Sequence, residues 1–221
     1  MKQFDISYYN TFIFDCDGVV LNSNKIKTNS FYIATKPYGL KPAQALVDYH
    51  LKNGGVSRYE KFRYFLTDIL GQSAEKKDLD KLLLVFADEV KKGLNNCEVA
   101  RGLDEFREKT KQSNWLIVSG GDQSELREMF SSRGLDKYFN AGIFGSPDNK
   151  DIILEREISC QNITMPGLFL GDSKYDYEAA KGAGLDFAYL SGWSESTYRF
   201  DEADYKFIDI ESILHQVNGS N

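Results

Sequence analysis

The sequence contains little cysteine and little histidine. Its three cysteines, Cys16, Cys97 and Cys160, are odd in number and scattered, and no C-x-x-C pair occurs. This spacing indicates neither a disulfide framework nor a zinc ribbon, and a reducing compartment is the simplest setting for such thiols. The only histidines are His50 and His215, so metal chemistry that depends on imidazole ligands is nearly excluded.

Long apolar runs and an excess of positive charge are also missing. No run approaches the roughly 20 residues that a membrane helix needs, and the N-terminal segment MKQFDISYYN has no apolar signal core. We therefore expect a cytoplasmic protein with no membrane partner. The formal net charge of −6 argues against nucleic acid as the main partner. An acidic protein that handles anionic substrates must create local positive potential from a metal ion, a few lysines or helix N-termini.

The composition is that of an ordinary folded domain. Apolar residues make up 42% and charged residues 27%, which argues against disorder, collagen and coiled coil. The length of 221 residues fits one domain, or one domain that carries a sizeable insertion. We expect a monomer or a homodimer.

Short apolar runs predict the strands of a parallel sheet. They span residues 11–15, 115–119, 141–145, 168–172 and 187–190. Because these runs do not alternate strictly with polar residues, they are typical of buried parallel strands. Helical patterns separate the later runs, so we predict an α/β fold with a doubly wound parallel sheet. Ligands bind at the carboxyl ends of the strands in such sheets, and Asp15, Ser119 and Asp172 end three of the runs.

Residues 22–95 interrupt this rhythm, because they show helical patterns only. Two apolar stripes each fit one face of a helix. They consist of Phe62, Phe65, Leu66, Ile69 and Leu70, and of Leu79, Leu82, Leu83, Phe86 and Val90. The helix stops are Gly39, Gly54, Gly55, Gly71 and Gly93. We predict an all-helical cap domain over residues 22–95, inserted into an α/β core of residues 1–21 and 96–221, and we expect it to act as a lid.

The first motif places two carboxylates, Asp15 and Asp17, directly after the first strand and before Gly18. Such like charges are costly together unless a cation is bound, and Mg²⁺ suits carboxylate oxygens completed by phosphate oxygens. One carboxylate can attack a phosphorus atom while the second shuttles a proton. Cys16 lies between them, so we expect its side chain to point away as a buried filler. A surface turn or a helix-capping Asp pair is the plain alternative.

The second motif ends a strand at Ser119 and starts a helix at about Asp122. Its hydroxyl and the free backbone N–H groups from Gly120 onward form a natural pocket for an oxyanion, although a plain strand-to-helix turn is the alternative. Lys150 opens a later helix, where its charge opposes the helix dipole. This position favours a lysine that faces a phosphate, whereas an isolated lysine is usually solvated.

The fourth motif is G-D-S-K-Y-D, in which Asp172 ends a strand and Asp176 opens the next helix. Both carboxylates can face one cation, Asp176 directly or through water. Ser173 can orient one of them. A cluster that caps the helix N-terminus is the alternative interpretation.

The order of these four motifs resembles that of the haloacid dehalogenase superfamily, whose members are mostly Mg²⁺-dependent phosphatases. The order is D-x-D-G, then the serine after a strand, then the lysine, then G-D-x-x-x-D. The resemblance covers residues 10–22 and 96–215. The helical insertion resembles the cap of the phosphoglycolate-phosphatase-like and phosphoglucomutase-like branch. Many relatives have Asp-Ser where this chain has Asn22-Ser23, which concerns contacts at the entrance of the site. The dehalogenase and phosphonatase branches are less similar, because they usually lack an acid equivalent to Asp17.

The resemblance implies a role for each motif residue. Asp15 would be the nucleophile, and Asp17 the general acid and base. Ser119, Gly120 and Lys150 would bind the transferring phosphoryl group.

The same resemblance implies a Mg²⁺ site. Asp15, Asp172 and the main-chain carbonyl of Asp17 would bind the ion, and Asp176 would support the site. We therefore predict a Mg²⁺-dependent phosphatase that hydrolyses a small phosphorylated metabolite, a sugar phosphate or a phosphoglycolate-like compound, through an aspartyl phosphate. A sugar phosphomutase would use the same residues, and a non-catalytic phosphate-binding protein could share the fold. A receiver-like signalling domain is disfavoured by the helical insertion and by Asp17.

Within the predicted cap, residues 53–61 are the strongest candidate for contacts with the leaving group. Gly54 and Gly55 lead into a helix whose first turns carry Arg58 and Lys61. A free helix start together with Arg58 could grip a sugar hydroxyl, a carboxylate or a second phosphate. Alternatively, the glycines only end one helix and Arg58 is solvated. We expect His50 to serve packing rather than chemistry.

Overall fold

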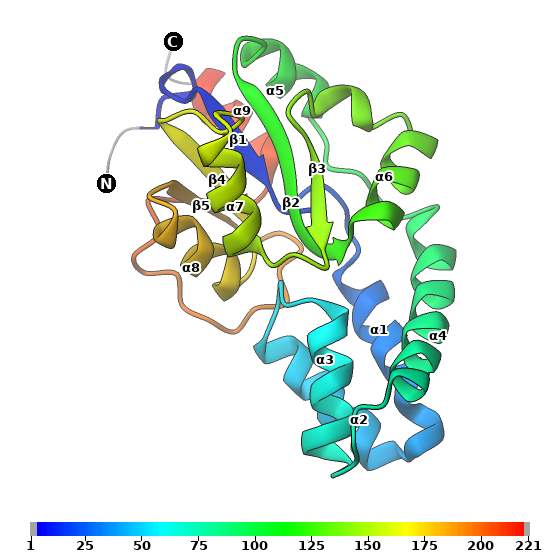
Figure 1. Ribbon diagram of the computed structural model, residues 1–221. Coiled ribbons are helices and arrows are strands. Elements are labelled where there is room, and N and C mark those ends of the chain that lie inside the picture. The colour runs from blue at the N-terminus through cyan, green and yellow to red at the C-terminus, as the bar shows by residue number, and fades with distance from the viewer. Residues whose placement is uncertain (1–3, 219–221) are drawn as a thin grey trace.

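A six-stranded sheet forms the centre of the computed structural model, which describes residues 4–218 (Figure 1). The strand order is β3-β2-β1-β4-β5-β6, and every neighbouring pair is parallel. The strands are β1 (Thr11–Phe14), β2 (Asn114–Asp122), β3 (Gly142–Ser146), β4 (Gly167–Gly171), β5 (Asp186–Leu190) and β6 (Tyr205–Phe207). The predicted doubly wound parallel sheet is confirmed.

Each predicted apolar run forms a strand, with two differences between prediction and structure. β2 does not end at Ser119 but continues to Asp122, because the chain stays extended through the glycine pair and its register with β3 shifts after Val118. The sequence does not predict β6, because its three residues alternate buried, exposed and buried over too short a span to show a pattern.

Helices cover both faces of the sheet. One face carries α5 (Leu103–Lys109), α6 (Gln123–Ser132) and α9 (Ile210–Asn218), and the other carries α7 (Lys150–Ser159) and α8 (Lys174–Gly182). Successive side chains of a strand point to opposite faces. Phe12 and Phe14 of β1 therefore enter the first apolar core, and Ile13 enters the second. Within residues 4–218, no helix has both the length and the apolar character to cross a membrane.

Between β1 and β2 the chain forms a separate group of helices at one end of the sheet (Figure 1). These are α1 (Asn24–Thr35), α2 (Leu40–Lys52), α3 (Arg58–Tyr64), the π-helical turn η3 (Phe65–Ile69) and α4 (Lys76–Leu94). They enclose an apolar cluster of their own, which includes Phe31, Leu46, Phe62, Phe65 and Phe86. Short 3₁₀ turns complete the described elements at η1 (Ile6–Tyr8), η2 (Lys36–Tyr38) and η4 (Asp136–Tyr138).

The helical prediction for this insertion is confirmed in outline and wrong in one detail. The stripe that begins at Phe62 is not one regular helix, because the chain passes from α3 into the wider π turn at Phe65. The predicted stops lie between helices, except that Gly93 lies in the last turn of α4.

The chain leaves the core and returns to it at adjacent points. Leu21 forms an isolated antiparallel bridge with Val99. The Asn22 amide donates to the Glu98 carbonyl, and the Ala100 amide donates to the Val20 carbonyl, each at 2.9 Å. These paired connections are typical of an inserted module that is attached at one place. The exact domain boundaries at residues 21/22 and 95/96 stay a prediction.

Candidate active site

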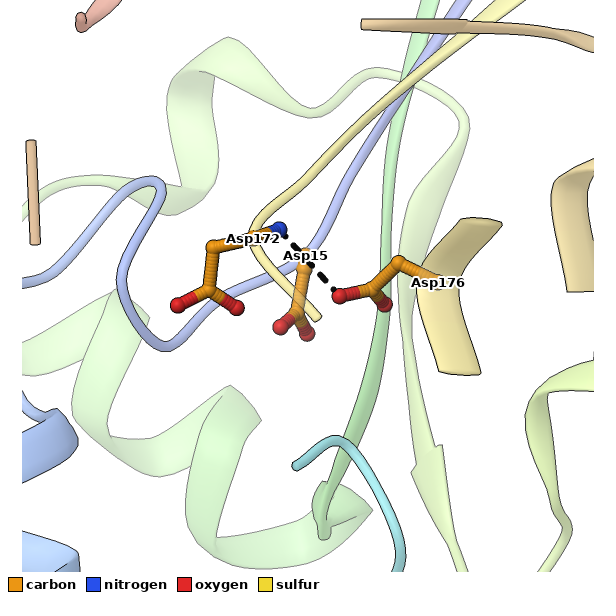
Figure 2. A group of neighbouring side chains, drawn as sticks. All are labelled: Asp15, Asp172 and Asp176. Carbon is orange, nitrogen blue, oxygen red and sulfur yellow. Dashed lines mark hydrogen bonds between the residues drawn. The ribbon is translucent and has the colours of Figure 1, made fainter. Parts of the chain in front are cut away.

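The acidic residues of the first and fourth motifs meet at the carboxyl ends of β1 and β4. These two strands pair in parallel, so Asp15 and Asp172, which follow them, come from adjacent strand ends. Asp176 reaches the same place from the first turn of α8 (Figure 2). One carboxylate oxygen of each residue lies within 4.8 Å of the other two. All three residues are buried, so little water screens the repulsion between their charges.

Asp176 is held by the loop that follows β4. Its Oδ2 accepts hydrogen bonds from the Ser173 hydroxyl (2.6 Å), the Ser173 amide (2.9 Å) and the Asp172 amide (3.3 Å). Ser173 in turn caps α8, because its Oγ accepts a hydrogen bond from the Asp176 amide. The Oδ1 of Asp176 forms an ion pair with Lys150. Both oxygens of Asp176 therefore have protein partners, and the side chain orients Lys150 and this loop.

Asp15 has the least satisfied oxygen of the cluster. Its Oδ1 lies 2.9 Å from Lys150 Nζ as an ion pair, yet this buried atom accepts no hydrogen bond of good geometry. Burial raises the pKa of Asp15 to about 7, and repulsion from Asp176 adds to the rise, whereas Lys150 opposes it. Burial and the same acidic neighbours raise the pKa of Asp172 well above its usual range. A divalent cation with oxygen ligands would relieve this repulsion, and the donor set fits Mg²⁺.

Lys150 is the positive centre of this acidic cluster. It opens α7 directly after Asn149, whose side chain caps the helix by accepting a hydrogen bond from the Ile152 amide. Only 1% of Lys150 is exposed. Burial lowers the pKa of Lys150, but attraction to Asp15 and Asp176 outweighs burial and raises the pKa above its ordinary value. The lysine is therefore charged at neutral pH and lies beside Asp15, as a phosphate-facing lysine requires.

Both carboxylate oxygens of Asp17 have partners outside the cluster of Asp15, Asp172 and Asp176. Its Oδ1 accepts a hydrogen bond of 2.5 Å from Ser23 Oγ, and its Oδ2 forms an ion pair with Lys27 of α1. Burial alone would raise the pKa of Asp17, but Lys27 and Ser23 outweigh it and lower the pKa. Gly18 has φ of +78°, and a Cβ there would lie 2.2 Å from Asp172 Oδ2. Only glycine therefore lets the first motif fold this close to the fourth.

Two further expectations for these motifs concern Cys16 and Ser119. Cys16 is buried in the apolar core, as expected. Ser119 is also buried, and its Oγ accepts a hydrogen bond of 3.0 Å from the Gly121 amide. Asp122 caps α6, because its Oδ1 accepts hydrogen bonds from the Ser124 and Glu125 amides. The second motif is thus both a capped helix start and a wall of the pocket described next.

A pocket lies between these strand ends and the inserted helices. Its core wall includes Asp15, Asp17, Gly120, Gly121 and Asp172. Its helical wall includes Lys27, His50, Arg58 and Lys61. The loop before α3 packs directly on the core, since a Cβ on Gly120 would lie 2.2 Å from the Gly55 carbonyl oxygen. A Cβ on Gly55 would lie 2.8 Å from Ser173 Oγ. Glycine at both positions allows the helical wall to sit close to the acidic cluster.

Arg58, a predicted substrate contact, lines this pocket but already has an acidic partner. The residue is buried, its Nη1 donates to Glu125 Oε1 at 3.2 Å, and its Nη2 forms an ion pair with Glu125 Oε2. Next to it, Tyr59 donates a hydrogen bond of 2.8 Å to Asp122 Oδ2. These contacts join α3 to α6, and a contact between Arg58 and substrate stays a prediction.

Two polar residues that line the pocket, Asn24 and Lys27, have no predicted site role. Asn24 donates a hydrogen bond of 2.7 Å to Asp172 Oδ2, and Lys27 pairs with Asp17, although neither residue shows a distinguishing signal in the sequence. Lys61 belongs to the predicted segment of residues 53–61, and it directly precedes the apolar residue Phe62 near the start of α3. A lysine inside an apolar stripe needs a reason for its burial.

The chain matches the haloacid dehalogenase-like hydrolase family over residues 12–190. It therefore belongs to this family and is a hydrolase. Among curated proteins, no sequence matches it.

Several solved structures share the fold. One is a predicted phosphatase from Clostridium acetobutylicum, with a TM-score of 0.73 and 16% identity over 96% of this chain and 99% of that chain. A predicted phosphoglycolate phosphatase from Haemophilus somnus 129PT has a TM-score of 0.71 and 17% identity, over 95% and 98% of the chains. CbbY from Rhodobacter sphaeroides, solved in complex with phosphate, has a TM-score of 0.70 and 14% identity, over 95% and 99%. At these identities the similarity shows the fold alone.

Proposed function

We propose that this hydrolase is a Mg²⁺-dependent phosphatase that acts on a small phosphomonoester through an aspartyl phosphate. One observation carries the proposal. Asp15 is a buried carboxylate with an incompletely satisfied oxygen, and it lies beside Lys150 and Asp172 at the wall of a pocket. A nucleophile, a fixed positive charge and a second acidic ligand are the groups that phosphoryl transfer to a carboxylate requires.

Asp15, Asp172 and the main-chain carbonyl of Asp17 would hold Mg²⁺. When bound, the ion neutralises charge on the phosphoryl oxygens and offsets the repulsion between Asp15 and Asp172. Asp176 keeps Lys150 in place through their ion pair. Lys150, Ser119 and the amides that follow Ser119 would bind the remaining phosphoryl oxygens.

In the first step, a carboxylate oxygen of Asp15 forms a bond to phosphorus while the bond between phosphorus and the leaving-group oxygen breaks. This step requires Asp17 in its protonated form, and that proton passes to the leaving-group oxygen, so the leaving group departs as an alcohol. In the second step, Asp17 accepts a proton from water, and the water oxygen attacks the phosphorus of the aspartyl phosphate, which restores Asp15. Lys27 and Ser23 stabilise the carboxylate form of Asp17, which is the form that the second step requires.

The inserted helices would serve as the lid of this site. The loop at Gly54 and Gly55 packs on Ser173 and Gly120, and the helical wall closes the pocket opposite the acidic cluster. A closed pocket keeps bulk water away from the phosphoryl group during the first step and strengthens each charge interaction inside it. The wall also contacts whatever leaving group the substrate carries, so we expect it to select the substrate.

Phosphate release from 4-nitrophenyl phosphate tests the proposal. We expect turnover that requires added Mg²⁺, stops on addition of excess EDTA and returns when Mg²⁺ is restored. A panel of phosphorylated metabolites, assayed in the same way, then ranks substrates by kcat/KM. Folded protein that releases no phosphate from any member of the panel with Mg²⁺ would contradict a phosphatase.

A further inference from the structure

Lys61 of α3 is a buried lysine on the helical wall of the pocket. Only 2% of the residue is exposed, and its Nζ lies 5.4 Å from the centre of the Phe31 ring. Its one hydrogen-bond partner among the described residues is His50, whose Nδ1 lies 2.8 Å from Nζ. A lysine ammonium has three N–H groups, so two of them have no hydrogen-bond partner among the described residues.

The hydrogen bonds beyond His50 determine the direction of this contact. Thr28 donates its hydroxyl proton to Glu195 Oε2 at 2.7 Å, so Thr28 Oγ1 must accept from His50 Nε2, which lies 3.1 Å away. His50 Nδ1 then carries no proton and accepts from Lys61. Burial lowers the pKa of His50 well below its usual range, and the nearby Lys61 adds to this effect. The partner of Lys61 is therefore a neutral imidazole that brings no negative charge.

Lys61 differs in this respect from the other cations around the site. Lys27 pairs with Asp17, and Arg58 pairs with Glu125. Lys150 pairs with both Asp15 and Asp176. Within residues 4–218, no carboxylate lies in ion-pair contact with Lys61. Burial accordingly lowers its pKa to about 7, and the nearby Lys27 adds to the fall. A buried cation without an acidic partner is costly, and an anion supplied by a ligand would remove that cost.

We propose that Lys61, oriented by His50, binds a carboxylate on the leaving group of the substrate. The proposal rests on the proposed function, because it assumes that the phosphoryl group lies at Asp15 in the same pocket. The substrate class is then the phosphorylated hydroxy acids, which include phosphorylated sugar acids. One lysine and one neutral imidazole offer a single positive charge, which matches a carboxylate better than a dianionic second phosphate.

Matched pairs of phosphate esters that differ only in a carboxylate test this proposal. They are 2-phosphoglycolate and 2-hydroxyethyl phosphate, 3-phosphoglycerate and glycerol 3-phosphate, and 6-phosphogluconate and glucitol 6-phosphate. For at least one pair we expect kcat/KM to favour the acid by about tenfold or more, the size of one charge-assisted hydrogen bond. In Lys61→Met the preference falls to within about twofold, mainly through KM. Lys52→Met removes an exposed lysine from the end of α2 and keeps the preference.

A binding measurement separates this proposal from the proposed function. Calorimetric titration with 3-phosphonopropanoate and with 3-hydroxypropylphosphonate, both of which resist hydrolysis, reports the carboxylate preference without turnover. Acid-selective binding that Lys61→Met abolishes supports the subsite even if no ester is hydrolysed. Hydrolysis without preference for the acid in any pair, in wild type and in Lys61→Met, overturns the subsite and leaves the phosphatase intact.

Two further outcomes are also decisive. A preference for bisphosphates over all three acids that depends on Lys61 overturns the carboxylate assignment. If Lys61→Met does not give a native circular dichroism spectrum, Lys61→Gln replaces it. The wild-type measurement needs no variant. If the wild-type protein prefers the acid in none of the three pairs, the proposal is overturned.

Discussion

The two walls of the pocket carry opposite charge and are built in different ways. The core wall takes its acids from the ends of adjacent parallel strands, where Asp15 and Asp172 are brought together by the sheet itself. The helical wall takes its cations from separate helices of the insertion, Lys27 from α1 and Lys61 from α3. Among the described residues, the three buried acids share one lysine, Lys150, and Lys61 on the opposite wall has no acidic partner, so a metal ion and an anionic substrate would complete the site together.

Removing Asp15, the proposed nucleophile, from the core wall has the largest expected effect. Asp15→Asn should lower kcat by roughly 10⁴-fold or more, because the amide cannot form the aspartyl phosphate and one Mg²⁺ ligand loses its charge. The fold should persist, since the substitution relieves repulsion in the cluster. Phosphate release and thermal unfolding measure the two effects, and Asp80→Asn, at an exposed position in α4, provides the matched control. A variant that retains a tenth of the wild-type rate would exclude Asp15 as the nucleophile.

Removing Lys150 should mainly affect stability. Among residues 4–218 it is the only lysine in ion-pair contact with Asp15 and Asp176. Lys150→Met leaves these two buried carboxylates without a counter-charge, so we expect the free energy of unfolding to fall by about 3 kcal/mol. Added Mg²⁺ should restore part of this loss, because the proposed Mg²⁺ site exists only in the folded protein. Urea unfolding with and without Mg²⁺ measures both effects. A loss below about 1 kcal/mol would show that these acids need little compensation.

The acidity of the core wall predicts how Mg²⁺ binding depends on pH. The pKa of Asp15 is raised to about 7, so at lower pH a proton must leave before the metal can bind. We expect the affinity for Mg²⁺ to fall by about tenfold between pH 8 and pH 6, with protons released on binding. Calorimetry in buffers of different ionisation enthalpy measures both quantities. The Asp15→Asn variant should show less of this dependence, and an unchanged dependence would assign it to other groups.

The smallest expected effect comes from the helical wall. In the unfolded chain a lysine has a pKa of about 10.4, whereas burial lowers that of Lys61 to about 7 in the folded protein. Between these values the unfolded chain binds more protons, so the contribution of Lys61 to stability improves as pH rises. Lys61→Met should therefore stabilise the protein by about 1 kcal/mol at pH 7 and by less at pH 9.5.

Denaturant unfolding at the two pH values measures this difference, and Lys52→Met serves as the control for loss of a lysine charge at the surface. Equal destabilisation by Lys61→Met at both pH values would show that the lysine is stabilised by an acidic partner. Lys61 would then no longer differ from the other cations of the pocket, each of which has an acidic partner.

The core wall could be predicted from the sequence because its geometry follows from strand order. A residue that ends a buried parallel strand lies at a known edge of the sheet, so the sequence places Asp15 and Asp172 correctly at strand ends, whereas Ser119 lies three residues before the end of β2. The sequence does not predict β6 (Tyr205–Phe207), because three residues of mixed polarity show no periodicity. The helical wall could not be predicted in the same way. Lys61 and His50 are separated by a loop, and their contact depends on how α2 and α3 pack.

The sequence alone determined the α/β class, the helical insertion and the order of the acidic motifs, because strand and helix periodicities are local properties of the chain. Only the tertiary structure decided which charges are paired. In the predicted segment of residues 53–61, Arg58 pairs with Glu125, while Lys61 has no acidic partner among the described residues. Such pairing depends on side chains from different helices that approach within a few ångströms, and this distance is set by how the inserted helices pack against the sheet.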